Sequence, residues 1–339
     1  MSLDKQNYKI DEKLKKAYIN SFNGVSDEIY YLIIICTKIL RCDVETKLIE
    51  ADIDRLYDEF VYFKYYSKMS KDYLLDFFMP LMLASRGFDN YEETAKNLSE
   101  KLCRFYGIEG KKYEYIMDVF CYDIIMRNLL MENFDMLDIL NKVKDGLIEF
   151  NPYMDSKIDN VKFQVKKIKY IENLHKCIDN YEFEITYDIC ETGIGVVDVL
   201  QCAFNEEYFE NYSRKSDYGI ISVYNVLKSL MDSENKADEK IETAENFKSS
   251  IYRSFIKAMA EHLLRIRYGQ VKIGKYNLKA SPREFLNREV GEEFADPILS
   301  RVKIDSREVI KEDGNSRIAV ELSTKTGKYR FEYKIVENR

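Results

Sequence analysis

Apolar residues recur at intervals of three and four through most of residues 1–268, which is the spacing of one face of an α-helix. Ser26 precedes one of these runs and carries the side-chain oxygen that an N-cap residue needs. Pro80 lies within a strongly apolar run and should kink that helix, because proline removes a backbone donor. The pattern predicts helices over 27–41, 45–67, 70–86, 90–106, 111–132, 134–149, 157–180, 196–209, 218–231 and 237–268.

One segment, residues 182–189, departs from the helical spacing. Its apolar residues alternate with polar ones, and a period of two over eight residues is typical of a β-strand. Ile185 and Ile189 are also four positions apart, so the helical pattern competes with the strand pattern. The sequence favours a strand here and leaves the helix open.

Beyond residue 268 the pattern becomes that of a short helix followed by a small antiparallel sheet. Ser281 and Glu284 form a capping-box pair around Pro282, and with Gly291 they predict a helix over 282–290. Asp313-Gly314 and Thr326-Gly327 then separate three alternating runs, which predicts a β-meander over 302–336. The runs are 302–310, 317–322 and 329–336.

One face of this expected sheet is apolar and must be covered, because a small sheet with one exposed apolar face is not stable alone. The cover should be the helix at 282–290 or the helical body. The residues of that face are Ile318, Val320, Leu322, Tyr329, Phe331, Tyr333 and Ile335.

The predicted fold is mainly α: a multi-helical bundle with a small C-terminal three-stranded antiparallel β-meander, and α+β overall. The length of 339 residues suggests more than one domain, and Pro152 marks a soft boundary. We expect an N-terminal helical domain over 1–152 and a second helical region over 153–268. A basic C-terminal module over 269–339 would then hold the short helix and the meander.

Composition places the chain among soluble globular proteins, with 46% hydrophobic and 33% charged residues. Its seven cysteines are odd in number and include no CxxC pair, which favours reduced thiols and a cytoplasmic location. The longest apolar runs, Tyr30–Cys36 and Phe77–Ala84, are too short to cross a bilayer, so no membrane span is expected. The 27 Tyr without any Trp, beside much Ile, Lys and Asn, fit an AT-rich genome.

Charge is distributed unevenly along the chain, whose formal net charge is −7. Residues 265–339 hold 17 Lys and Arg against 12 Asp and Glu, which leaves 35 against 47 for residues 1–264. No acid lies between Glu261 and Glu284. Cations interleaved with aromatic rings can hold phosphates and stack bases. The candidate binding residues are Arg265, Arg267, Lys272, Lys275, Tyr276, Lys279 and Arg283.

A second interpretation of this basic segment is that its cations neutralise the acidic helical body, as an internal electrostatic complement. Four lysines at 162, 166, 167 and 169 form another basic cluster on the helix predicted over 157–180. They would support a polyanion surface only if they shared a face of the molecule with the first cluster.

Catalytic chemistry has little support in the sequence. His175 and His262 are the only histidines, and His262, near Arg265 and Arg267, is a weak candidate for a general base. No pattern predicts a metal site or a cofactor site. The turn Gly193-Ile-Gly195 lacks the third glycine of a phosphate-binding loop and is better explained as a tight turn.

The sequence therefore predicts a cytosolic, non-enzymatic binding or regulatory protein. Its basic surface over 265–339 would contact a protein partner or a polyanion such as RNA or DNA. The alternative is an enzyme that processes nucleic acids or nucleotides, with a site between the helical body and the C-terminal module.

Overall fold

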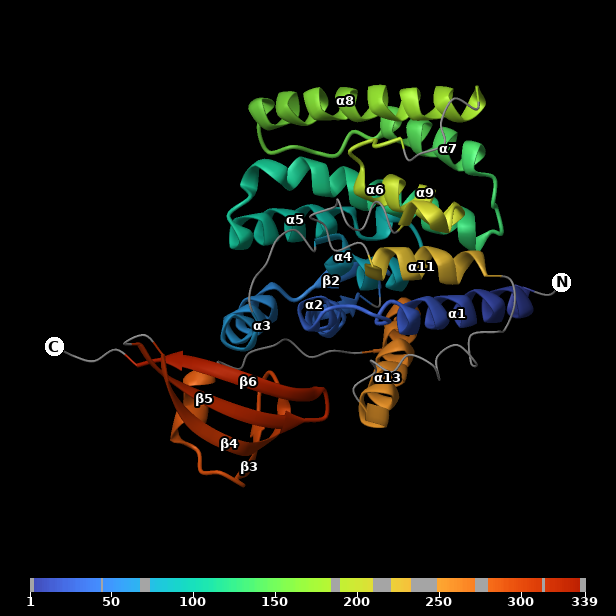
Figure 1. Ribbon diagram of the computed structural model, residues 1–339. Helices are drawn as coiled ribbons and strands as arrows, with labels where there is room; N and C mark the ends of the chain where they lie inside the picture. The colour runs from blue at the N-terminus through green and yellow to red at the C-terminus, as the bar shows by residue number, and fades with distance from the viewer. Residues whose placement is uncertain are drawn as a thin grey trace.

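A computed structural model shows a stack of helices with an antiparallel sheet docked at one end (Figure 1). No described helix is long and apolar enough to cross a membrane. The structure describes residues 3–43, 45–67, 74–183, 190–209, 221–232, 249–271, 280–312 and 315–335. Of the strand predicted over 182–189, residues 184–189 lie outside this set, and Glu182 is the last residue of a helix.

From Asp27 onward the described helices of the body follow the predicted order, whereas a helix at the N-terminus, over Leu3–Asn20, was not predicted. Ser26 accepts a hydrogen bond from the backbone N–H of Ile29 at 3.4 Å, as expected of an N-cap. The helices are α1 (Leu3–Asn20), α2 (Asp27–Ile39), α3 (Ile53–Tyr66), α4 (Leu74–Ala84), α5 (Glu92–Tyr106), α6 (Lys112–Leu130), α7 (Met136–Glu149), α8 (Lys157–Glu182), α9 (Gly195–Phe204), α11 (Ile221–Met231) and α13 (Ser249–Arg267). Short 3-10 helices η1 (Phe88–Asn90), η2 (Glu109–Lys111) and η3 (Pro282–Asn287) connect some of them.

The helix predicted over 45–67 begins eight residues later than expected. Strands β1 (Leu40–Cys42) and β2 (Ile49–Ala51) pair antiparallel ahead of it. Asp52 then caps α3, its side chain accepting from the N–H of Arg55 at 3.1 Å. Ile49 belongs to β2, and its side chain is buried from that strand. Its helical spacing to the residues of α3 is therefore a coincidence.

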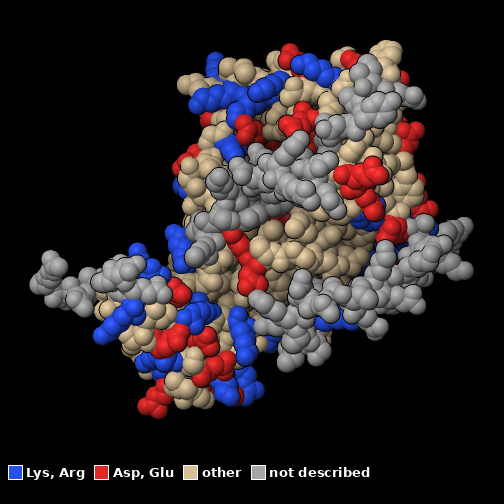
Figure 2. Space-filling view, in the orientation of Figure 1, with Lys and Arg blue, Asp and Glu red and all other residues tan. Residues whose placement is uncertain are grey.

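The C-terminal sheet has four strands, so the prediction of three was wrong. Its order is β3 (Glu293–Asp296), β4 (Ser300–Glu312), β5 (Asn315–Thr324) and β6 (Gly327–Lys334), all antiparallel. Strand β3 is only four residues long, too short for alternation to stand out from the surrounding chain. Acidic and basic side chains alternate over the face of the sheet seen in Figure 2.

The helix predicted over 282–290 is the 3-10 helix η3, which ends at Asn287. Ser281 makes no side-chain capping bond there, so the expected capping box does not form. Phe285 is fully buried within η3 and faces the rings of Tyr62 and Phe331 edge-on. Arg288 is already extended. The six residues of η3, about two turns of a 3-10 helix, are enough to place Phe285 in the core under the sheet.

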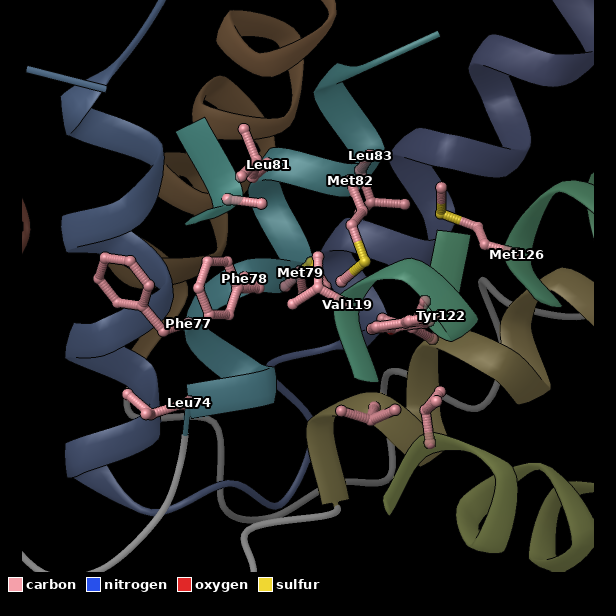
Figure 3. Packing of buried hydrophobic residues seen from close by; sticks show 14 of the residues in the cluster. Leu74, Phe77, Phe78, Met79, Leu81, Met82, Leu83, Val119, Tyr122 and Met126 are labelled. Atoms are coloured by element: carbon pink, nitrogen blue, oxygen red, sulfur yellow. The ribbon is translucent and has the colours of Figure 1, made fainter. Parts of the chain in front are cut away.

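Two hydrophobic cores lie on either side of α3. The larger runs from Leu14 to Ile266 and has α4 near its centre, where Figure 3 shows α4 side chains packed against those of α6. The smaller lies under the sheet and includes Tyr62 of α3. The expected apolar face of the sheet supplies that core through Val320, Leu322, Tyr329, Phe331 and Tyr333, which are all buried.

Tyrosines fasten the sheet to the body. Tyr31 stacks on Tyr329 with ring centroids 4.9 Å apart. The hydroxyls of Tyr30 and Tyr31 donate to the carbonyls of Thr326 and Lys328, each at 3.0 Å. Tyr62 donates to Asp296 at 2.7 Å. Their rings bury apolar area while their hydroxyls pair with groups of the sheet, which is the way that buried tyrosine is usually accommodated.

Candidate functional site

Arg267, one of the predicted anion-binding residues, points into the protein. Its guanidinium donates to the carbonyl of Leu83 at 3.3 Å and to that of Ser85, so it caps the C-terminal end of α4. Cations are favoured at this end of a helix by the helix dipole. Burial first, and then the charges of Arg127 and Arg86, lower the pKa of Arg267 to about 10. Arg267 is therefore a structural residue.

The remaining residues of the predicted binding set are only partly described. Arg265 is exposed on α13 and Arg283 is exposed on η3. Lys272, Lys275, Tyr276 and Lys279 lie outside the described residues. Two exposed arginines are thus what the structure places of the expected basic surface.

Most arginines of the described sheet module are compensated locally. Arg330 contacts Glu308, Glu321 at 3.0 Å and Glu332 at 3.6 Å. Across the strands Arg317 pairs with Glu332 at 3.2 Å and Arg301 with Glu293 at 2.6 Å. Surface ion pairs of this kind contribute little to stability, but they reduce the positive field that a polyanion would meet. These pairs lie within the sheet, so the module compensates its own charge, and they do not neutralise the acidic helical body.

His262, the weak candidate for a general base, lies on α13 close to cations. It is half-buried on α13, where burial and then the charges of Arg265 and Arg55 lower its pKa. Glu261, the adjacent carboxylate, forms an ion pair with Lys15 of α1 at 2.8 Å. The charged groups that lower the pKa of His262 are therefore cations. The carboxylate of Glu261 is paired with Lys15.

Two carboxylates of the chain, those of Asp198 and Asp118, lie beside the turn at Gly193-Ile-Gly195. Asp198 accepts from the backbone N–H and the hydroxyl of Thr192, at 2.8 and 2.7 Å. A Cβ added to Gly195 would lie 3.9 Å from the Asp118 carboxylate and 3.3 Å from Leu75. Burial, followed by the charge of Asp198, raises the pKa of Asp118 well above its ordinary value. An incoming phosphate would meet two acids here, so the turn is structural.

The feature that the sequence analysis missed is the outer face of α8. Ile158, Val161, Val165 and Ile168 are 68, 62, 63 and 55% exposed. Their spacing of three, four and three puts them in one row, as in a coiled-coil seam. We call these four residues the α8 stripe. The opposite side of the helix is buried through Phe163, Tyr170, Leu174 and Cys177, so α8 has two apolar faces and only one is covered.

The lysines of α8 divide into two groups according to their contacts. Lys167 is buried and donates to the carbonyls of Ile148 and Phe150 at 3.2 and 2.9 Å, at the end of α7. Lys166 pairs with Glu114. Lys162, Lys169 and Lys176 are exposed beside the stripe, and Figure 2 shows Lys and Arg along the upper edge of the molecule, where α8 lies.

This cluster does not reinforce the basic C-terminal segment. Figure 1 places α8 at one end of the helical stack and the sheet at the other. The condition that both clusters share a face is therefore not met. The sequence shows that α8 has two apolar rows, one at 158, 161, 165 and 168 and the other at 163, 170, 174 and 177, but it does not show which row is exposed.

Fold and surface together define a mainly helical protein with a docked four-stranded antiparallel sheet and an uncovered apolar seam on its outermost helix. The chain matches no protein-family model, no curated protein and no solved structure.

Proposed function

We propose that this chain is a non-enzymatic binding protein whose helical body presents the α8 stripe to a protein partner. The observation that supports the proposal is the exposure of four β-branched apolar residues in one row on an outer helix. Contiguous apolar patches with a polar rim commonly mark interaction sites, whereas scattered apolar residues do not. The free cysteines support a cytoplasmic location as part of the same proposal.

The size of the stripe sets the kind of contact that it can make. Burying a Val or Ile completely contributes about 1.5–3 kcal/mol, so covering these four partly exposed residues contributes roughly 4–7 kcal/mol. Association itself costs at least about 4 kcal/mol. At most about 3 kcal/mol of that gain remains, less than the roughly 4 kcal/mol of a millimolar complex, so the polar flanks of the stripe and further partner contacts must supply most of the affinity.

A photo-crosslinker tests this function directly. Benzoylphenylalanine at Ile168 should form a discrete protein adduct in the source cells, and Val161→Ser with Val165→Ser should abolish it. The same probe at Val309, an isolated apolar residue on the sheet that is 59% exposed, should not form that adduct. An adduct that survives the double substitution, or no adduct at Ile168, would contradict the proposed function.

An anionic partner at residues 265–339 remains a second proposal, supported by the exposed Arg265 and Arg283. It predicts a salt-dependent gel shift with RNA or DNA, because cations that neutralise phosphates release counterions. Charge reversal of Lys272, Lys275 and Lys279 to Glu should abolish the shift. A shift that charge reversal leaves unchanged, or no shift at low salt, would exclude this surface.

A further inference from the structure

We infer that the partner of the α8 stripe is an amphipathic helix with acidic flanks, lying lengthwise along α8. This inference rests on the proposed function and names the chemistry of the partner. The stripe supplies a hydrophobic seam, and the lysines beside it supply the complementary charge.

The charge around the stripe is strongly one-sided. Residues 157–171 contain five lysines and one acid, Asp159, on a chain whose net charge is −7. Asp159 is already engaged, because its carboxylate accepts from Tyr113 and, at 2.8 Å, from Ser156. Because Lys166 is paired with Glu114 and Lys167 is buried, the exposed cations of this half of α8 are Lys157, Lys162 and Lys169, and a partner that bears carboxylates would complement them.

The exposed lysines are placed as a coiled coil would place them. If Ile158 and Val161 take the two seam positions of a heptad, then Lys162, Lys169 and Lys176 recur every seventh residue along one edge. At about 1.5 Å per residue this repeat spans about 21 Å, with Lys162 and Lys169 beside the stripe and Lys176 beyond its end at Ile168. Acids at the flanking positions of a facing helix would meet them in register, and such pairs select partner and orientation.

A second copy of this chain is a poor occupant of the stripe. In an antiparallel pair the lysine edge of one α8 would face the lysine edge of the other. In a parallel pair it would face the opposite edge, which carries Lys157 and Gln164. Within residues 157–171 neither arrangement places a carboxylate opposite the lysines, and like charges that meet at a seam oppose pairing.

An anionic membrane fits less well than a helix. The stripe consists of β-branched residues, which pack between the side chains of a facing helix, whereas helices that lie in a membrane surface favour Trp, Phe and Leu.

Peptide binding to the full chain tests the inference. Three labelled peptides of about 20 residues, enough to match the lysine edge, share one apolar seam and differ only in their flanks, which are Glu, Gln or Lys. Fluorescence anisotropy should show the Glu peptide binding at least roughly tenfold more tightly than the Lys peptide. Lys162→Glu, Lys169→Glu and Lys176→Glu together should invert that order.

A matched control carries the same charge change at the other end of the molecule: Lys303→Glu, Lys311→Glu and Lys325→Glu, which are exposed in the sheet module. It should leave all three affinities unchanged. The double variant Val161→Ser/Val165→Ser should lose every peptide and still unfold at the normal temperature.

The outcomes distinguish a failure of the inferred acidic partner from a failure of the proposed function. Equal binding of all three peptides, lost in the double Ser variant, would overturn the acidic partner and leave the proposed function standing. No binding by any peptide would overturn the inference and leave the crosslinking result to decide the function. Stripe-dependent dimers in sedimentation, or stripe-dependent binding to phosphatidylserine vesicles with no peptide binding, would replace the partner helix by a second copy or a membrane.

Discussion

At the scale of single residues, ionisable side chains within this protein serve the fold. Arg267, Lys167 and Asp198 all bond to backbone groups at helix ends or turns. Lys38 of α2 pairs with the buried Glu59 and donates to the carbonyl of Ile298 at 2.9 Å, which ties the body to the β3–β4 turn. Buried charges are tolerated only when partners satisfy them, and these partners come from segments distant in the chain.

Asp76 gives a prediction at this scale. It is fully buried in α4, and burial raises its pKa well above the ordinary value. A carboxyl whose folded pKa is raised binds its proton more tightly when folded, so its stabilising contribution is complete below about pH 4 and is lost as pH rises. Each pKa unit corresponds to about 1.4 kcal/mol.

Asp76→Asn should therefore flatten the fall in unfolding free energy between about pH 4 and pH 8, as measured by urea denaturation at several pH values. Asp145→Asn, at an exposed position of α7, is the control and should keep the slope of the parent protein. A variant slope equal to that of the parent would show that Asp76 ionises normally in the folded protein.

At the scale of elements, periodicity predicted the described helices from α2 onward, but it missed α1 and placed several helix ends less well. Ser26 and Gly107, which has a φ of +70° after α5, could be placed because caps have strong residue preferences. The β1–β2 hairpin and β3 could not, because strands of three or four residues carry too few alternations to outweigh a neighbouring helix. Ser281 failed as a cap because the burial of Phe285 sets the local geometry instead.

The candidate site was harder to predict than the fold, because exposure depends on the packing of distant segments. A run of Lys and Arg at 265–283 predicts a basic surface, yet Arg267 turns inward to meet carbonyls of α4. The α8 stripe has the same spacing as a core face. Only the placement of α8 as the outermost helix shows that its second apolar face is left uncovered.

At the scale of the whole molecule, the two ends have different characters. One end carries the sheet, where cations and acids neutralise each other across the strands and tyrosines join it to α2 and α3. The other end carries α8, where exposed lysines lie beside an apolar seam. Binding along α8 would leave the sheet accessible, so the protein could hold a partner at one end without disturbing the docked module.

The central claim is that the α8 stripe serves binding and not the fold of this chain. Urea unfolding of Val161→Ser/Val165→Ser tests it most directly, since Ser and Val have similar helix propensities. We expect a free energy of unfolding within about 0.5 kcal/mol of the parent, whereas Val143→Ser, at a fully buried position of α7, should lose about 2 kcal/mol or more. A loss of about 2 kcal/mol in the double variant as well would show that the chain itself covers the stripe, and would contradict the account.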